Sequence, residues 1–170
     1  EQVQARLRLG LFTMVRDGSI RRDTPALTGL PGAAARRLIL ASDTVWAPDL
    51  LERGYLDEAA RQAVKMGLHP LQALQALTLA PAEHFGLDGR VGGLAPGRQA
   101  DILLIPDLAA FRPRAVIARG RLVAEEGRMV VPVPPLPAAT LPGPRAPAGF
   151  GPATLALPAP AARCRVRCIH

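Results

Sequence analysis

One carboxylate in this sequence, that of Asp43, follows a short apolar run, where it could take part in catalysis. The apolar run at residues 38–41 ends in Ser42, Asp43 and Thr44, with no Gly or Pro turn signal at that point. In parallel α/β folds the active site lies at the carboxyl ends of the strands, so an acidic residue directly after a buried strand would face the reaction. Such a carboxylate can bind a divalent metal ion or act as a general base. The competing interpretation is a turn or helix-capping role, which Asp often has.

Other side chains near Asp43 in the sequence are weaker candidates. They end the preceding apolar stretch or follow Asp43 itself, and they either line the mouth of a pocket or pack in exposed loops: Asp17, Ser19, Trp46, Asp49 and Tyr55. The two histidines in helical segments favour structural roles, His69 at a helix start before Pro70 and His84 in a short helix. Asp101 begins a strand, and this position indicates that its side chain fixes a turn.

Two further patterns do not support a binding site. Gly92, Gly93 and Gly97 lie between a helix and a strand, without the strand–turn–helix order of a phosphate-binding loop. Cys164, Cys168 and His170 could suggest a metal cluster. Cysteines four residues apart in an extended segment would be roughly 13 Å apart at ordinary strand rise, which is too far for a shared metal without a bend.

Composition narrows the class of protein. The chain has 170 residues, about one domain's worth, with 49% hydrophobic and only 4% aromatic residues. Its net charge of +7 comes from arginines, since Lys65 is the only lysine, and they are scattered rather than clustered with aromatics. This distribution does not favour a nucleic-acid partner. Two cysteines make no disulfide framework, and no apolar run approaches a membrane span of about 20 residues, so we expect a cytoplasmic protein without a membrane partner.

The elements that must position Asp43 follow from the periodicity. We expect helices and strands in alternation, which is typical of a parallel α/β structure: a helix over 1–10, a strand over 11–16, at most a short helix in 20–35, a strand over 37–43, and helices over 56–67, 70–80 and 81–87. Asp17-Gly18 closes the first strand as a turn signal.

After residue 88 the sequence patterns favour strands and turns in place of helices. A Gly-rich stretch leads to a strand at 101–105, and residues 114–130 predict two strands joined near Gly120 with a return at Gly127. Residues 131–160 hold 10 of the 18 prolines, which indicates a linker. Residues 163–169 alternate like the first strand of a further domain. We therefore expect domain segments at 1–88, 89–130, 131–162 and 163–170, in an internal piece of a longer protein.

Three stretches together resemble the adenine deaminase family of the metal-dependent amidohydrolase superfamily. "HPLQALQALTLAPAEHFGLDGRVGGLAPGRQADILLIPD" is similar to the closing segment of the superfamily. "LRLGLFTMVRDGS" and "LILASDTVWAPDLLERGYLDEAARQAV" are similar to two segments of adenine deaminases. The resemblance covers about residues 1–130, and the tail only weakly.

The resemblance implies both a fold and a reaction. The α/β chain would be the last strands and helices of an amidohydrolase-type (β/α)8 barrel, followed by part of a small β-sandwich domain and a Pro-rich linker. Residues 37–43 would be the eighth barrel strand, with Asp43 as metal ligand and general base in the deamination of adenine to hypoxanthine and ammonia, a purine salvage reaction. The divalent metal would be manganese or iron rather than zinc, and its other ligands would lie outside this chain.

The sequence also departs from the family. Asp17 stands where the family usually has Glu, Thr44 where a second Asp is common, and Tyr55 where His is frequent. These differences leave open another hydrolase of the superfamily that acts on a cyclic amide or amine. A truncated, non-catalytic barrel fragment and a basic nucleic-acid-binding protein are two further hypotheses, and a homo-oligomeric state is left open. Small-molecule substrate and water are the expected partners.

Overall fold

The computed structural model describes residues 2–133 and 146–156. The chain divides into two units, Glu1–Val133 and Pro134–His170. Within the described residues, none of the helices is long and apolar enough to cross a membrane. The predicted strand at 163–169, with Cys164, Cys168 and His170, lies outside the described residues. The domain boundaries drawn from the sequence remain a prediction.

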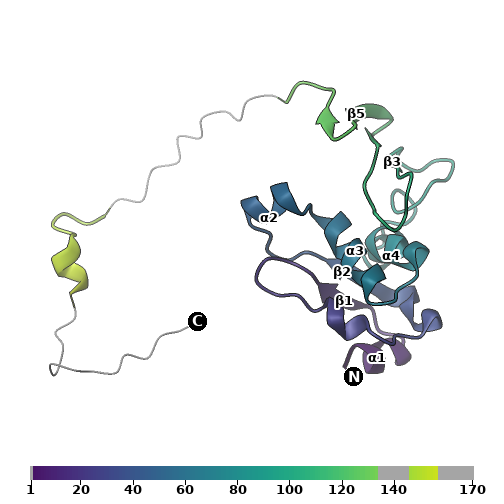
Figure 1. Ribbon diagram of the computed structural model, residues 1–170, viewed down its shortest axis with the longest axis horizontal. Helices are drawn as coiled ribbons and strands as arrows, with labels where there is room; N and C mark the ends of the chain where they lie inside the picture. The colour runs from purple at the N-terminus through teal and green to yellow at the C-terminus, as the bar shows by residue number, and fades with distance from the viewer. Residues whose placement is uncertain (1, 134–145, 157–170) are drawn as a thin grey trace. The chain divides into compact units, whose positions relative to one another are not determined.

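Two short parallel strands form the centre of the first unit. β1 (Thr13–Arg16) pairs with β2 (Leu38–Ala41), and Thr13 lies opposite Leu38 at one end and Arg16 opposite Ala41 at the other. Figure 1 shows the two strands side by side. The connection between them contains the 3-10 turns η1 (Thr24–Leu27) and η2 (Gly32–Arg37). The parallel α/β arrangement and the shortness of the helical segments in this connection are as the sequence predicts.

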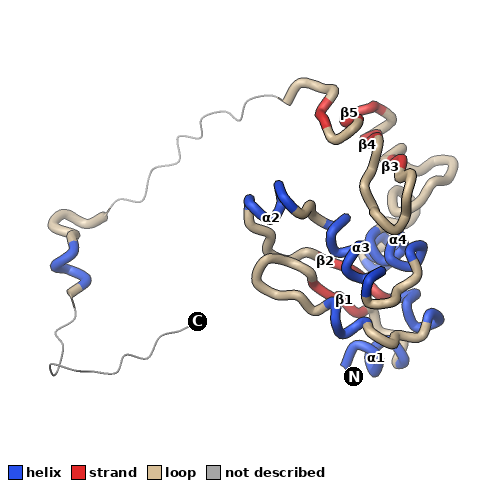
Figure 2. Tube along the Cα trace, in the orientation of Figure 1, coloured by secondary structure: helices blue, strands red, loops and turns tan. Residues whose placement is uncertain are grey.

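Within residues 2–133, five short helices accompany this strand pair, among the blue segments of Figure 2. They are α1 (Gln2–Arg8), α2 (Ala47–Glu52), α3 (Leu56–Lys65), α4 (Pro70–Leu77) and α5 (Leu79–His84). The predicted boundary between the last two is wrong. The break occurs at Thr78, whose φ of −125° and ψ of −75° are not helical. Pro81 lies inside the first turn of α5, where a missing N–H is tolerated because first-turn N–H groups have no intrahelical partner. The short helix α2 is not anticipated from the sequence.

Small side chains let helices α3 and α4 approach β2 closely. The buried faces of these helices are made of alanines: Ala59, Ala60, Ala63, Ala73 and Ala76. All of these alanines except Ala59 belong to one core cluster with Val15, Leu38 and Leu40, which are at most 3% exposed. Successive side chains of a strand alternate between its two faces, so Met14 and Arg16 lie on the face of β1 opposite Val15. Met14 is 49% exposed, so helices α3 and α4 cover one face of the pair only.

A second sheet follows in the same unit. Its strands are β3 (Ile102–Leu104), β4 (Ala115–Ala118), β5 (Arg121–Glu125) and β6 (Arg128–Met129), antiparallel in that order. The turn between β4 and β5 has positive φ at both central residues, Arg119 (51°) and Gly120 (76°), as a tight hairpin turn requires. The hairpins predicted at Gly120 and Gly127 are therefore confirmed.

The turn before β4 contributes one large side chain to the core. Phe111 is 2% exposed and belongs to the same apolar cluster as Val15 and Leu38. Its φ of 48° is unusual for an aromatic residue, and its N–H bonds the Asp107 carbonyl at 3.0 Å. Arg61 of α3 donates a hydrogen bond to the Ala110 carbonyl at 3.2 Å, so this turn is held to α3 by both apolar and polar contacts.

Candidate active site at the ends of the parallel strands

Asp43 emerges two residues after the carboxyl end of β2, as the sequence predicts. Its backbone takes the left-handed conformation, with φ of 60°, which Asp tolerates better than most residues. Ser42, just before it, is 5% exposed, so the chain leaves the sheet through a buried residue. The Asp43 side chain is 49% exposed. This carboxylate is thus presented at the strand end rather than buried in the core.

The loop after β1 lies directly against the exit of β2. The Asp17 N–H bonds the Ala41 carbonyl at 2.8 Å, and the Ser19 N–H bonds the Thr44 carbonyl at 2.8 Å. A Cβ added to Gly18, between these two bonds, would lie 2.3 Å from the Ser42 carbonyl oxygen and 2.5 Å from that of Thr44. Only glycine allows this approach, so residues 17–19 fix the backbone on both sides of Asp43.

An arginine from the neighbouring strand contacts the Asp43 carboxylate. Arg16 Nη1 donates to Asp43 Oδ2 at 2.7 Å, although the two residues are 27 positions apart. The Nε atom of the same guanidinium lies 3.5 Å from Asp23 Oδ2. The Arg16 carbonyl also accepts the Asp23 N–H at 2.7 Å. The guanidinium therefore lies between two carboxylates at the end of the strand pair.

A small open hollow lies beside this strand end. It is lined by Asp17, Gly18, Ser19, Val45, Asp49, Arg53, Gly54, Tyr55 and Glu58. Four of the weaker sequence candidates therefore come together there, whereas Trp46, 58% exposed, is not one of the lining residues. Asp43 is not among them either, so the hollow and the candidate carboxylate are neighbouring but separate features.

Two of the residues that line this hollow are tied to the loops around it. Asp17 is 5% exposed, and its Oδ2 accepts a hydrogen bond from the Thr24 hydroxyl at 2.7 Å. Ser19 Oγ accepts the Trp46 N–H at 2.9 Å. Through these bonds Asp17 and Ser19 hold the loops at the strand ends in place.

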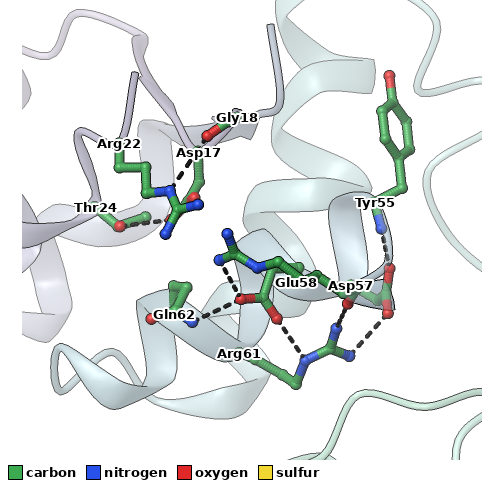
Figure 3. A network of polar contacts seen from close by, with 10 residues as sticks. Asp17, Gly18, Arg22, Thr24, Tyr55, Asp57, Glu58, Arg61 and Gln62 are labelled. Carbon is green, nitrogen blue, oxygen red and sulfur yellow. Dashed lines mark hydrogen bonds and ion pairs between the residues drawn. The ribbon is translucent and has the colours of Figure 1, made fainter. Parts of the chain in front are cut away.

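A network of polar contacts is centred on Glu58 of α3 (Figure 3), and two of its members, Arg53 and Glu58, line the hollow. Glu58 accepts hydrogen bonds from Arg53 at 2.9 Å, Gln62 at 2.7 Å and Arg61 at 3.0 Å. Burial alone raises the pKa of the Glu58 carboxyl, but these three donors outweigh it and lower the pKa from 4.5 to about 2. The hydrogen bond to Glu58 in turn raises the pKa of Arg53. Arg61 also bonds Asp57 at 2.8 Å, which extends the network to the start of α3.

Lowering the pH should reduce the stability that this network gives to the fold. Because the folded pKa of Glu58 lies below its unfolded value, the ionised carboxylate stabilises the fold above about pH 4.5, and this stability is lost as the pH falls toward 2. We expect Glu58→Gln to cost about 1.5–3 kcal/mol at pH 7, typical of hydrogen bonds to a charged group. Urea unfolding of both proteins from pH 7 to pH 3 measures this, and a difference that does not shrink with acid would contradict it.

The remaining sequence candidates have structural contacts. The His69 Nδ1 atom accepts the Leu71 N–H at 3.3 Å and caps α4. The His84 ring, at the end of α5, lies 4.9 Å from that of Phe12 between ring centroids. Asp101 accepts the Arg119 N–H at 2.7 Å and so holds the β4–β5 turn; this hydrogen bond and one from Gln99 lower its pKa.

The glycines after α5 also have a structural explanation. Gly92 has φ of +89°, and a Cβ added to it would lie 2.6 Å from the Ala82 Cβ. The loop therefore packs closely against α5 at Gly92, which gives this glycine a structural role.

Asp43 fits a metal ion as one ligand of a larger set. A carboxylate is a suitable ligand for manganese, iron or magnesium. Asp43 Oδ2 accepts a hydrogen bond from the Arg16 guanidinium at 2.7 Å, so a metal ion at this carboxylate would bind through Oδ1. Within residues 2–133 and 146–156, no three His, Cys, Asp or Glu side chains come together as a metal site. A catalytic metal at Asp43 would therefore need ligands from other parts of the polypeptide.

Sequence reasoning missed Arg16 and the role of Gly18. A signal for Arg16 existed, because it ends an apolar strand one residue before the Asp17-Gly18 turn, as Asp43 nearly ends the next strand. The strand alternation that places Val15 in the core assigns Arg16 to the other face. What the sequence does not show is that the two strands are neighbours.

The chain is similar in sequence to known proteins. Residues 5–123 match the model of the amidohydrolase family. The chain is 41% identical over 139 residues to adenine deaminase 4 of Rhizobium meliloti (strain 1021), covering 79% of this chain and 23% of the relative. It is 41% identical over 173 residues to the adenine deaminase of Rubrobacter xylanophilus, covering 97% of this chain and 28% of the relative. The chain thus spans about a quarter of the length of these curated relatives.

A solved structure resembles the fold as well. A structure described as the structural and catalytic characterization of molinate hydrolase matches with a TM-score of 0.50 and 19% identity, over 83% of this chain and 39% of that chain. At this identity the match concerns the fold alone. It agrees with the α/β class predicted from the sequence.

Proposed function

The chain belongs to the amidohydrolase family, and from this premise we propose that it is the part of an adenine deaminase that supplies the last two strands of the barrel. Relatives with that name are 41% identical to the chain. The observation that carries the proposal is the position of Asp43 at the carboxyl end of β2, parallel to β1. The active sites of (β/α)8 barrels lie at this end of the strands.

In the proposed reaction, water attacks C6 of adenine. The water oxygen forms a bond to C6, the bond between C6 and the amino nitrogen breaks, and the products are hypoxanthine and ammonia. Asp43 accepts a proton from the attacking water and delivers a proton to the departing amino group. Its half-exposed carboxylate and the fixed backbone on both sides of it suit this role.

A bound divalent metal would supply a nucleophilic water at neutral pH. We propose manganese or iron, with Asp43 as one ligand and the others from the part of the enzyme that precedes these strands. A cytoplasmic purine salvage enzyme that uses adenine and water is the corresponding biological role. The bound metal can be identified by elemental analysis of the full-length protein purified without added metal.

The substrate proposal is tested on the full-length enzyme loaded with manganese or ferrous iron. Ammonia release and hypoxanthine formation are measured with adenine, with other aminopurines and with cyclic amides. We expect adenine to give the highest kcat/KM. A higher kcat/KM with a cyclic amide would support a different hydrolase of the superfamily, which Thr44 and Tyr55 leave open at the sequence level.

The isolated chain of residues 1–170 should show no deaminase activity. One carboxylate does not hold a catalytic metal against water, because such sites use several ligands with further hydrogen-bonding support. The measurement is ammonia release from adenine with added manganese or ferrous iron, together with circular dichroism to establish that the chain is folded. Turnover well above a metal-only blank would show that the site has been misplaced.

A further inference from the structure

The contact between Arg16 and Asp43 differs from an ordinary surface ion pair in how the arginine is held. Arg16 Nη1 donates to Asp43 Oδ2 at 2.7 Å, and its Nε lies 3.5 Å from Asp23 Oδ2. The Asp23 N–H also bonds the Arg16 carbonyl at 2.7 Å, so side chain and backbone are tied to the same residue. The side chains of Arg16 and Asp23 are only 35% and 37% exposed. A rigid, planar guanidinium anchored at two points has little freedom to turn.

The Asp43 side chain is constrained from its own backbone as well. Its φ of 60° and the bonds from residues 17–19 to Ala41 and Thr44 fix the Cα of Asp43 relative to β1. Rotation of the carboxylate is the main freedom that remains. The hydrogen bond from Arg16 to Oδ2 restricts this rotation.

We propose that Arg16 is a positioning residue that holds the Asp43 carboxylate through Oδ2 and so orients Oδ1 toward the metal and the attacking water. This inference rests on the proposed function, since it concerns the same carboxylate. Hydrogen-bonding partners of metal ligands orient them and typically change metal affinity or activity by 10–100-fold when removed. Arg16 would act in this way through Asp43, without contacting the substrate.

The experiment compares Arg16→Ala with Arg21→Ala in the full-length enzyme. Arg21 is a matched control, because it lies 3.7 Å from the same Asp23 carboxylate, is 62% exposed and makes its ion pair away from Asp43. Manganese binding is measured by calorimetric titration, and kcat and KM for adenine by ammonia release. We expect Arg16→Ala to weaken manganese binding and lower kcat by about 10–100-fold, with little change in KM, and Arg21→Ala to leave all three unchanged.

Two further variants distinguish positioning from a general structural effect. Arg16→Lys keeps the charge but cannot bridge two carboxylates with a planar fork, so we expect intermediate manganese affinity. In an Asp43→Asn background, Arg16→Ala should weaken manganese binding no further, because its effect passes through the carboxylate. An equal loss in both backgrounds, or unchanged affinity and kcat in Arg16→Ala, would overturn the proposal. A large drop in the thermal midpoint of metal-free Arg16→Ala relative to the metal-free wild type would also count against it, because lost metal linkage cannot explain a change in the metal-free proteins.

Failure of the proposed function would give a different result. If the wild-type enzyme binds manganese but does not deaminate adenine, the substrate assignment is wrong, and the titrations still report on Arg16. If the wild type binds no divalent metal, Asp43 is not a metal ligand, and the role of Arg16 falls with it.

Discussion

Asp43→Asn in the full-length protein is expected to abolish deamination of adenine while leaving the fold largely intact. Asparagine has the size of aspartate and can still coordinate through its amide oxygen, but it has no negative charge and cannot accept a proton as a carboxylate does. Loss of a general base alone costs about 10²–10⁴-fold, and weaker metal binding would add to that. The core residues Leu38 and Leu40 are untouched, so thermal unfolding should change little apart from the lost metal linkage.

The measurement is kcat/KM for adenine and metal content on the same preparation. Glu52→Gln is a suitable control, because it removes one carboxylate charge from the exposed helix α2 in the segment that follows Asp43. If Asp43→Asn retains more than about a tenth of the activity, an effect far below the general-base range, Asp43 is not the base. The turn-residue interpretation of its sequence position would then hold.

Gly18→Ala should destabilise the protein and lower activity together. The new Cβ would lie 2.3 Å and 2.5 Å from the carbonyl oxygens of Ser42 and Thr44, and backbone atoms cannot move away as a flexible side chain can. The loop after β1 must therefore separate from the exit of β2, which breaks the Ser19–Thr44 hydrogen bond and displaces Asp43. Overpacking of this kind costs about 1–3 kcal/mol or more, which denaturant unfolding measures.

Gly89→Ala provides the comparison for this substitution. A Cβ at Gly89 would meet no atom within 4 Å, so the variant tests the general cost of replacing a loop glycine. We expect it to unfold close to the wild-type denaturant concentration. Equal unfolding midpoints for the Gly18 and Gly89 variants would show that the strand-end loops are not packed as the structure has them.

Much of the fold could be predicted because its signals are local. The apolar stretches around β1 and β2, the alanine-rich helices, and the hairpins at Gly120 and Gly127 each depend on residue types within a few positions. The boundary between α4 and α5 could not be placed from the sequence. Good helix formers lie on both sides of Thr78, and Pro81 would suit the first position of a helix as well as the first-turn position that it takes in α5. The burial of Phe111 was also hidden, since it depends on packing against residues of the strands and helices far from it in the sequence.

In the candidate site, too, some features follow from the local sequence and others only from the tertiary structure. That Asp43 directly follows a buried strand was determined by the sequence, because an apolar run and its first polar residues are adjacent in the chain. That Arg16 reaches it at 2.7 Å, and that Gly18 locks the two strand ends together, was decided only by the tertiary structure. The pairing of β1 with β2 brings together residues 27 positions apart, and no local pattern encodes the register of a parallel pair joined by so irregular a connection.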